Sequence, residues 1–156
     1  MAAIAGLVRR HGITKMLLPV AAMHEFARQA VGHPDDVRTL RELITTGDRL
    51  VITPEMRKMG DALPGVTFDD HYGSTEVNVV TAPRLSAPAR DWPSRPFIGS
   101  PIADARIYVL DEELNPLGQN LVGEIFVGGT PVARGYLGRP APVSYTHLTL
   151  PTIYSV

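Results

Sequence analysis

The residues best suited to chemistry lie together in the stretch Asp69–Glu76, which reads Asp-Asp-His-Tyr-Gly-Ser-Thr-Glu and follows a β-like run. It brings together the ring of Tyr72, a turn at Gly73, the hydroxyl of Thr75 and the carboxylate of Glu76. An aromatic ring stacks on other flat rings, and a carboxylate is a ligand for hard cations such as Mg²⁺. With a hydroxyl to bond a phosphate, this set can hold a nucleotide and its metal.

A second run of chemically distinctive residues, Gly123–Leu137, lies about fifty residues further along the chain. It reads Gly-Glu-Ile-Phe-Val-Gly-Gly-Thr-Pro-Val-Ala-Arg-Gly-Tyr-Leu. We interpret its glycines as turn residues, and Glu124 and Arg134 as structural polar contacts. Together the two motifs resemble the adenylate-forming enzymes, and most closely the amino-acid adenylation domains of nonribosomal peptide synthetases.

The resemblance implies a reaction and a set of site residues. Adenylate-forming enzymes join a carboxylate to the α-phosphate of ATP and expel pyrophosphate. Tyr72 matches the ring that packs on adenine, Thr75 the hydroxyl that bonds the phosphates, and Glu76 the carboxylate that holds magnesium. Gly73 matches the turn, and Ser74 stands where the family often has proline. The implied catalytic residues are Thr75 and Glu76, with ATP and Mg²⁺ as cofactors.

An earlier turn also resembles the family. In Thr45–Asp48 the backbone around Gly47 would border adenine and the acyl pocket. Gly47, Asp48 and Asp70 therefore join the nucleotide-binding set that the resemblance implies. From its residues alone, this segment fits an ordinary strand-to-helix turn equally well.

The family's acyl pocket carries over by position onto a largely apolar set with one imidazole. These residues are Leu17, Ile44, Thr46, His71, Val79 and Val80. Simple core packing explains the aliphatic members as well, and the sequence does not separate the two interpretations.

The sequence lacks other parts that the family uses. It contains no Gly/Ser/Thr-rich phosphate loop, no second Thr-Gly-Asp segment downstream to grip the ribose, and no domain with the catalytic lysine. We therefore expect a fragment, inactive alone, of an enzyme that activates an amino acid or another carboxylic acid for transfer to a carrier-protein thiol. The alternatives are a fragment of an acyl-CoA or aryl-acid ligase, or a catalytically inactive α/β binding module.

The elements that must position these residues alternate between helix and strand in the first half of the chain. Apolar periodicity, the helix start Thr53-Pro54-Glu55 and the breaks at glycine and proline define them. The expected order is helix 4–11, strand 13–18, helix 23–30, strand 40–45, helix 53–63 and strand 66–68. This order predicts an α/β fold with a largely parallel sheet and flanking helices.

The pattern changes from about Pro83, where repeated prolines indicate a stiff, extended connection. Strands at 106–110 and 124–127 then predict a small antiparallel β unit. We divide the chain into an α/β subdomain fragment (1–82), a linker with a small β subdomain (83–142) and a non-native tail (143–156).

Composition restricts the function further. The chain has 156 residues, a net charge of −1 and no cysteine. There is thus no electrostatic case for nucleic acid or an anionic membrane as a partner, and no disulfide framework. No apolar run approaches the roughly 20 residues of a membrane helix, and no signal peptide is evident. We expect a soluble cytoplasmic protein.

Overall fold

A computed structural model describes residues 2–85 and 88–138. They belong to two compact units, each made of segments that are separate in the sequence. Unit 1 contains the chain up to Tyr72 together with Ala82–Ile98, and unit 2 contains Gly73–Thr81 and the chain from Gly99 onward. The domain boundaries inferred from the sequence stay predictions, and the proposed tail 143–156 lies outside the described residues.

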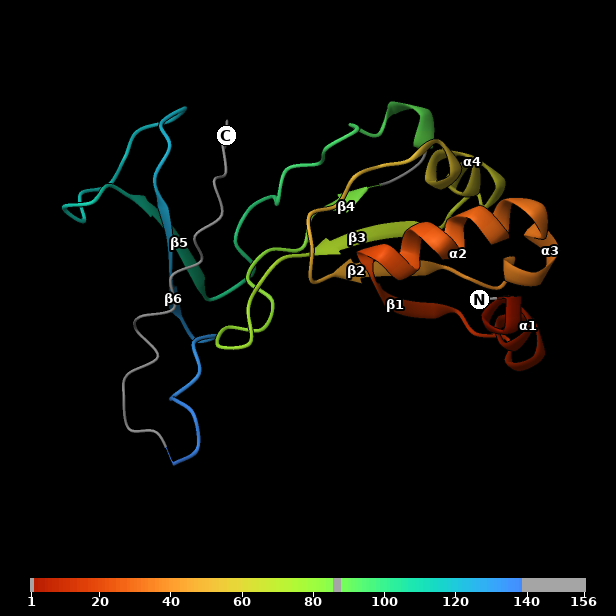
Figure 1. Cartoon of the computed structure of the whole chain (residues 1–156), viewed down its shortest axis with the longest axis horizontal. Helices are drawn as coiled ribbons and strands as arrows, with labels where there is room; N and C mark the ends of the chain where they lie inside the picture. Colours follow the sequence, from red (N-terminus) through yellow and green to blue (C-terminus); the bar gives the residue numbers. More distant parts are fainter. Residues whose placement is uncertain (1, 86–87, 139–156) are drawn as a thin grey trace. The chain divides into compact units, whose positions relative to one another are not determined.

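Unit 1 is built on a four-stranded sheet in the order β1-β2-β3-β4 (Figure 1). Its strands are β1 (Lys15–Pro19), β2 (Glu42–Thr46), β3 (Thr67–His71) and β4 (Arg84–Leu85). The first three run parallel, and β4 pairs antiparallel with β3. The predicted, largely parallel α/β sheet is therefore confirmed, while β4 arises within the segment predicted to be only an extended connection.

Helices precede or follow each of the parallel strands. They are α1 (Ala2–His11), α2 (Val20–Gly32), α3 (Pro34–Val37) and α4 (Pro54–Ala62), with a 3-10 turn η1 (Ala89–Asp91). The short α3 and η1 were not predicted. The expected start of α4 is confirmed, because the Thr53 hydroxyl accepts a hydrogen bond from the Met56 amide at 3.2 Å.

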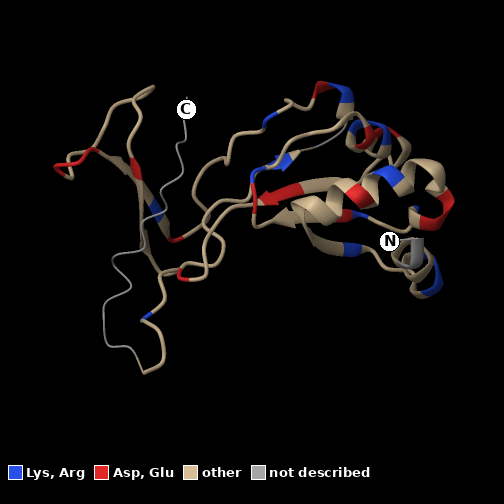
Figure 2. Ribbon diagram, in the orientation of Figure 1, with Lys and Arg blue, Asp and Glu red and all other residues tan. Residues whose placement is uncertain are grey.

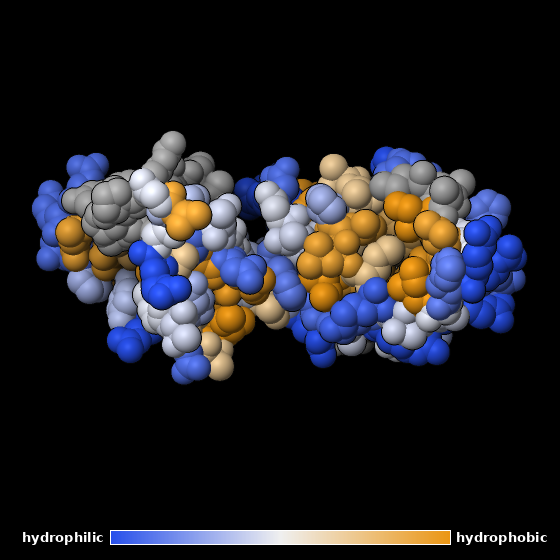
Figure 3. Space-filling model, turned by 90° about the horizontal axis from the view of Figure 1, so that it is seen from below, coloured by the Kyte–Doolittle hydropathy of each residue, from blue (hydrophilic) through white to orange (hydrophobic). Residues whose placement is uncertain are grey.

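The main core of unit 1 lies between one face of the sheet and helices α2 and α4; α2 crosses that face in Figure 1, and α4 packs against α2. Leu43 and Phe68 supply the sheet side of this core, and Met23 and Met56 supply the helix side. The opposite face carries Leu17 and Ile44, which are register partners. Leu17 is 54% exposed, and Figure 3 shows hydrophobic side chains gathered on the side of unit 1 where β1 is the edge strand.

One predicted helical face needs correction. The apolar spacing in the sequence predicts one face of α1 with Ile4, Leu7, Val8 and His11, but Leu7 and His11 are exposed. Val8 is buried as predicted, and Ala5 is buried in place of Leu7, because the helix packs against α2 and α3.

Unit 2 contains the predicted antiparallel pair, formed by β5 (Ala105–Leu110) and β6 (Glu124–Gly129). The segment Gly73–Thr81 joins this unit through a bridge between Thr81 and Pro101 and a 2.9 Å bond from the Ile102 amide to the Val80 carbonyl. None of the described helices is both long and apolar enough to cross a bilayer.

Candidate functional site

Four of the predicted pocket residues lie on the sheet face of unit 1 that is opposite α2 and α4. The register pairs Leu17 with Ile44 and Thr46 with His71, so these side chains alternate onto the same face. The Thr46 hydroxyl donates to the His71 carbonyl at 2.9 Å. Thr46 and His71 end β2 and β3, at the edge where open α/β sheets bind ligands.

The turn after β2 depends on Gly47. Its φ of +92° lies in the left-handed region, which residues with a side chain rarely adopt. Nothing lies within 4 Å of the position that a Cβ would occupy, so this side of the backbone is open. Asp48 stabilises the turn by accepting the Arg49 amide at 2.7 Å. An open glycine turn suits the predicted approach of a ligand, and that role stays a prediction.

Asp70 lies on the other face of β3 from His71, because neighbouring side chains in a strand point to opposite faces. Only 7% of Asp70 is exposed, and burial raises the pKa of its carboxyl to about 6. Its register partner Thr45 is also buried, and within the described part of the chain no hydrogen bond satisfies the Thr45 hydroxyl. The structure therefore places the side chain of Asp70, which was predicted to contact the nucleotide, beside the core of unit 1.

A pair that sequence reasoning did not single out lies beside the pocket residues. Arg84 on β4 donates Nε and Nη2 to the two carboxylate oxygens of Asp69 on β3, each at 2.7 Å. Figure 2 shows this acidic stretch of β3 next to the basic residue of β4. Glu42 on β2 lies 3.8 Å from Arg84 and forms an ion pair with Lys15 on β1 at 2.7 Å. Charged side chains therefore form a row across the sheet from β4 to β1.

In unit 2 the two sequence motifs meet at Glu76. The Ser74 hydroxyl donates to Oε2 of Glu76 at 2.7 Å, and the Tyr136 hydroxyl donates to Oε1 at 2.6 Å. The Ala133 amide also donates to the Glu76 carbonyl at 2.7 Å. The bonds from Tyr136 and then Ser74 lower the pKa of the Glu76 carboxyl. Glu76 is therefore an ionised, doubly hydrogen-bonded carboxylate at neutral pH.

The loop that carries Glu76 is tightly closed at Gly73. A Cβ on Gly73 would lie 1.5 Å from the Asn78 carbonyl oxygen, so only glycine fits. Thr75 is exposed in the same loop. Of the two predicted pocket valines, Val79 is half-buried and Val80 is fully buried, which packing alone explains.

The donor set suits magnesium. No group of three His, Cys, Asp or Glu side chains in 2–85 and 88–138 could form a metal cage. Magnesium rarely needs such a cage, because it usually keeps several waters and binds one or two carboxylates together with substrate phosphates. A single ionised carboxylate at Glu76 meets that requirement.

Tyr72 ends the first of the two segments of unit 1, directly after β3, and is half-buried. Tyr136 is the contact that the sequence did not predict. In the second motif we expected Glu124 and Arg134 to make polar contacts. The structure shows that the Tyr136 hydroxyl donates to Glu76 in the first motif. The signal in the sequence that could have suggested this contact is that Tyr136 lies among glycines, in the motif that carries the resemblance.

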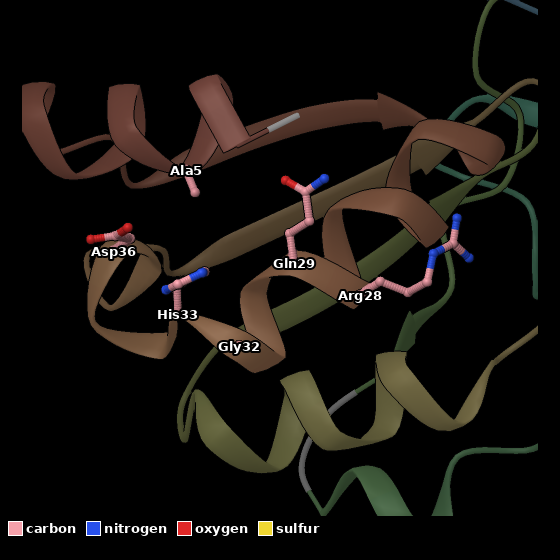
Figure 4. A pocket seen from close by; sticks show the side chains of 6 residues that line it. All are labelled: Ala5, Arg28, Gln29, Gly32, His33 and Asp36. Carbon is pink, nitrogen blue, oxygen red and sulfur yellow. The ribbon is translucent and has the colours of Figure 1, made fainter.

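A hollow of about 300 Å³ lies elsewhere in unit 1, among α1, α2 and the start of α3 (Figure 4). It is lined by Ala5, Arg28, Gln29, Gly32, His33 and Asp36. None of the predicted site residues lines it.

Comparison with known proteins gives one family. The protein-family model described as "AMP-binding enzyme" matches residues 1–137 of this chain. Tyrocidine synthase 2 of Brevibacillus parabrevis is 39% identical over 103 residues, which cover 66% of this chain and 3% of that protein. Phosphinothricin tripeptide synthetase PhsB of Streptomyces viridochromogenes is 36% identical over 137 residues, which cover 87% of this chain and 11% of that protein. The chain thus spans only a small part of these relatives.

Solved structures share the fold. VinN superposes with a TM-score of 0.74 at 24% identity, covering 89% of this chain and 34% of that one. NpsA-ThdA, an artificially fused adenylation–PCP di-domain from Klebsiella oxytoca, has a TM-score of 0.70 at 21% identity, covering 88% and 25%.

Proposed function

Because this chain belongs to the AMP-binding enzyme family, we propose that it is a segment of an adenylation domain of a peptide synthetase. The intact protein would activate an amino acid, or a related carboxylic acid, with ATP as an acyl-adenylate. The observation that carries the proposal is the ionised Glu76 carboxylate, held by Ser74 and Tyr136 within the motif that also contains Tyr72 and Thr75.

The proposed roles are those that the family resemblance implies, and the chemistry of each side chain fits them. Tyr72 presents an aromatic face to adenine, and Thr75, which is exposed, donates to a phosphate oxygen. Glu76 holds magnesium, and Gly47 and Asp48 border the nucleotide. Bound magnesium would supply positive charge that offsets the charge of the phosphates. Positioning and electrostatic stabilisation account for most of the catalysis in phosphoryl chemistry.

The acyl pocket is proposed at the wall formed by Leu17, Ile44, Thr46 and His71. Leu17 and Ile44 make this wall largely apolar. The Thr46 hydroxyl is engaged with the His71 carbonyl, so the imidazole of His71 is the principal polar group left to meet the acid. Val79 and Val80, which the resemblance also assigns to the acyl pocket, lie in unit 2, and their pocket role stays a prediction.

Transfer to the thiol of a carrier protein is the proposed second step. It is supported by the curated relatives, which include peptide synthetases, and by a structural neighbour that is an adenylation domain fused to a PCP. This segment alone is proposed to be inactive, because the phosphate loop and the catalytic lysine are missing from its sequence. Pyrophosphate exchange catalysed by the purified segment would contradict that.

The decisive experiment compares Glu76→Gln with Glu112→Gln in a complete protein that contains this sequence. Glu112 is an exposed carboxylate outside the proposed site, so its variant controls for the loss of one charge. Glu76→Gln should lower carboxylic-acid-dependent pyrophosphate exchange by about 10²-fold, the scale on which a single transition-state contact acts. If Glu76→Gln is as active as Glu112→Gln, the site proposed here is wrong.

A further inference from the structure

The Tyr136 hydroxyl reaches the Glu76 carboxylate from sixty residues away in the sequence and lies 2.6 Å from Oε1. We propose that Tyr136 is a positioning residue: it fixes the Glu76 carboxylate in the orientation that receives a divalent cation. The metal role of Glu76 is taken from the function proposed above. The positioning role goes beyond it and concerns only residues within unit 2.

The contact geometry indicates that the carboxylate is fixed at both oxygens. Ser74 donates to Oε2 and Tyr136 donates to Oε1, at 2.7 and 2.6 Å. Hydroxyl-to-carboxylate bonds of this length belong to the charge-assisted class, which is stronger than bonds between neutral groups. A glutamate held at only one oxygen could rotate about its terminal torsion, which is broad and has no sharp minima. The second hydroxyl removes that freedom.

Two hydroxyl donors leave the carboxylate able to bind a cation. An ionised carboxylate has about four acceptor sites, two on each oxygen. Ser74 and Tyr136 occupy one site on each oxygen, and the Glu76 backbone contributes a third hydrogen bond, so a site is still left for a cation. Among the ion pairs of the described residues, none neutralises Glu76. The hydroxyls therefore orient the charge without cancelling it.

The hydroxyl of Tyr136 is separable from the docking of its own segment. The Ala133 amide bonds the Glu76 carbonyl at 2.7 Å, which holds the second motif against the first through the backbone. Tyr136→Phe keeps the ring and this backbone bond and removes only the donor to the carboxylate. The variant should therefore fold while the carboxylate loses one of its two restraints.

The first test uses the 156-residue chain without nucleotide or metal. Side-chain NMR relaxation should give a lower order parameter for Glu76 in Tyr136→Phe than in the unchanged protein, because one of the two hydroxyls that hold its carboxylate is gone. Tyr108→Phe is the matched control, since Tyr108 is an exposed tyrosine of β5 with no bond to Glu76 among the described hydrogen bonds. An unchanged order parameter for the Glu76 side chain in Tyr136→Phe, with or without a lower melting temperature, would overturn the proposal.

The second test measures the Mg²⁺ requirement of adenylate formation in a complete protein containing this sequence. Tyr136→Phe should raise the Mg²⁺ concentration for half-maximal rate by about 10-fold, the lower end of the effect of removing a partner that orients a metal ligand. The KM for the carboxylic acid should not change, and Tyr108→Phe should match the unchanged protein.

The two proposals fail in different ways. If Glu76→Gln retains activity, Glu76 has no metal role and the proposed function of the site fails, whatever the NMR relaxation shows. If Glu76→Gln is inactive but Tyr136→Phe keeps the normal Mg²⁺ requirement, only the positioning role of Tyr136 fails. A raised Mg²⁺ requirement that appears equally in Tyr108→Phe would also overturn it.

Discussion

Arg84 and Asp69 face each other across the β3–β4 pair and are joined by two hydrogen bonds of 2.7 Å. The Asp69 side chain is 6% exposed, whereas that of Arg84 is 55% exposed. A strand of two residues makes few ladder bonds, so this fork-shaped contact is what fixes β4 at the edge of the sheet. The pKa of the Arg84 guanidinium is raised by the same carboxylate.

Replacing Arg84 should destabilise unit 1. Arg84→Met leaves the buried Asp69 carboxylate without its guanidinium, and an unpaired buried charge is costly. We expect a clear fall in the melting temperature by circular dichroism. Arg90→Met is the control, because Arg90 is 76% exposed and 3.9 Å from its partner, and it should change little. Equal melting temperatures for the two variants would show that the Asp69 contact contributes nothing.

Stability should depend on pH through Asp70. Its folded-state pKa of about 6 is above the ordinary value of 3.8, so the folded state binds the proton more tightly than the unfolded state. The contribution is therefore fully present below about pH 4 and is lost as the pH rises through about 6. Asp70→Asn stays neutral and should remove this decline. Urea unfolding from about pH 4 to pH 8 tests it, with the exposed Asp61→Asn as control; identical pH profiles for the two variants would contradict it.

Gly73→Ala should disrupt the loop that carries Glu76. Its Cβ would meet the Asn78 carbonyl at 1.5 Å, and backbone cannot move aside as a side chain can. Gly6→Ala is the opposite case, because nothing lies within 4 Å of the new Cβ and Gly6 lies inside α1. That change should stabilise the protein by about 0.5–1 kcal/mol. Equilibrium unfolding of both variants is the measurement, and a Gly73→Ala protein as stable as the unchanged one would show that the loop relaxes freely.

Loss of the Thr53 cap should weaken α4. The Thr53 hydroxyl satisfies the Met56 amide, which has no partner within the helix. Thr53→Ala should cost about 1 kcal/mol of unfolding free energy, and Thr53→Ser should recover most of it because serine caps equally well. Denaturant titration distinguishes these outcomes; a serine variant as unstable as the alanine variant would point to packing of the threonine methyl instead.

The elements of unit 1 were predictable where local signals agree. Thr53 followed by Pro54 and Glu55 defines the start of α4, and the spacing of Met23, Phe26 and Ala30 gives the buried face of α2. In α1 the signal was ambiguous, because Leu7 is the more apolar residue but Ala5 is the one that meets neighbouring helices. Periodicity alone favours the face with Leu7, but packing against the neighbouring helices buries the face with Ala5.

The strand β4 was not predictable, since Arg84 and Leu85 form it only through pairing with β3. The site shows the same limit. Ser74 and Glu76 are two residues apart, so their contact is a local one, whereas Tyr136 approaches from the other motif. A contact between residues sixty positions apart depends on the fold of unit 2, and the spacing of residues in the sequence does not reveal it.

The division of the chain between the units also sets an order of folding during synthesis. Unit 1 has all of its residues once the ribosome has passed Ile98, whereas Gly73–Thr81 must wait for partners as distant as Tyr136. Loops closed over so many residues form slowly, because their entropy is lost before the contacts are gained. On the nascent chain the Glu76 carboxylate can therefore meet its local partner Ser74 early, whereas it acquires the Tyr136 hydroxyl only after about sixty more residues have been made.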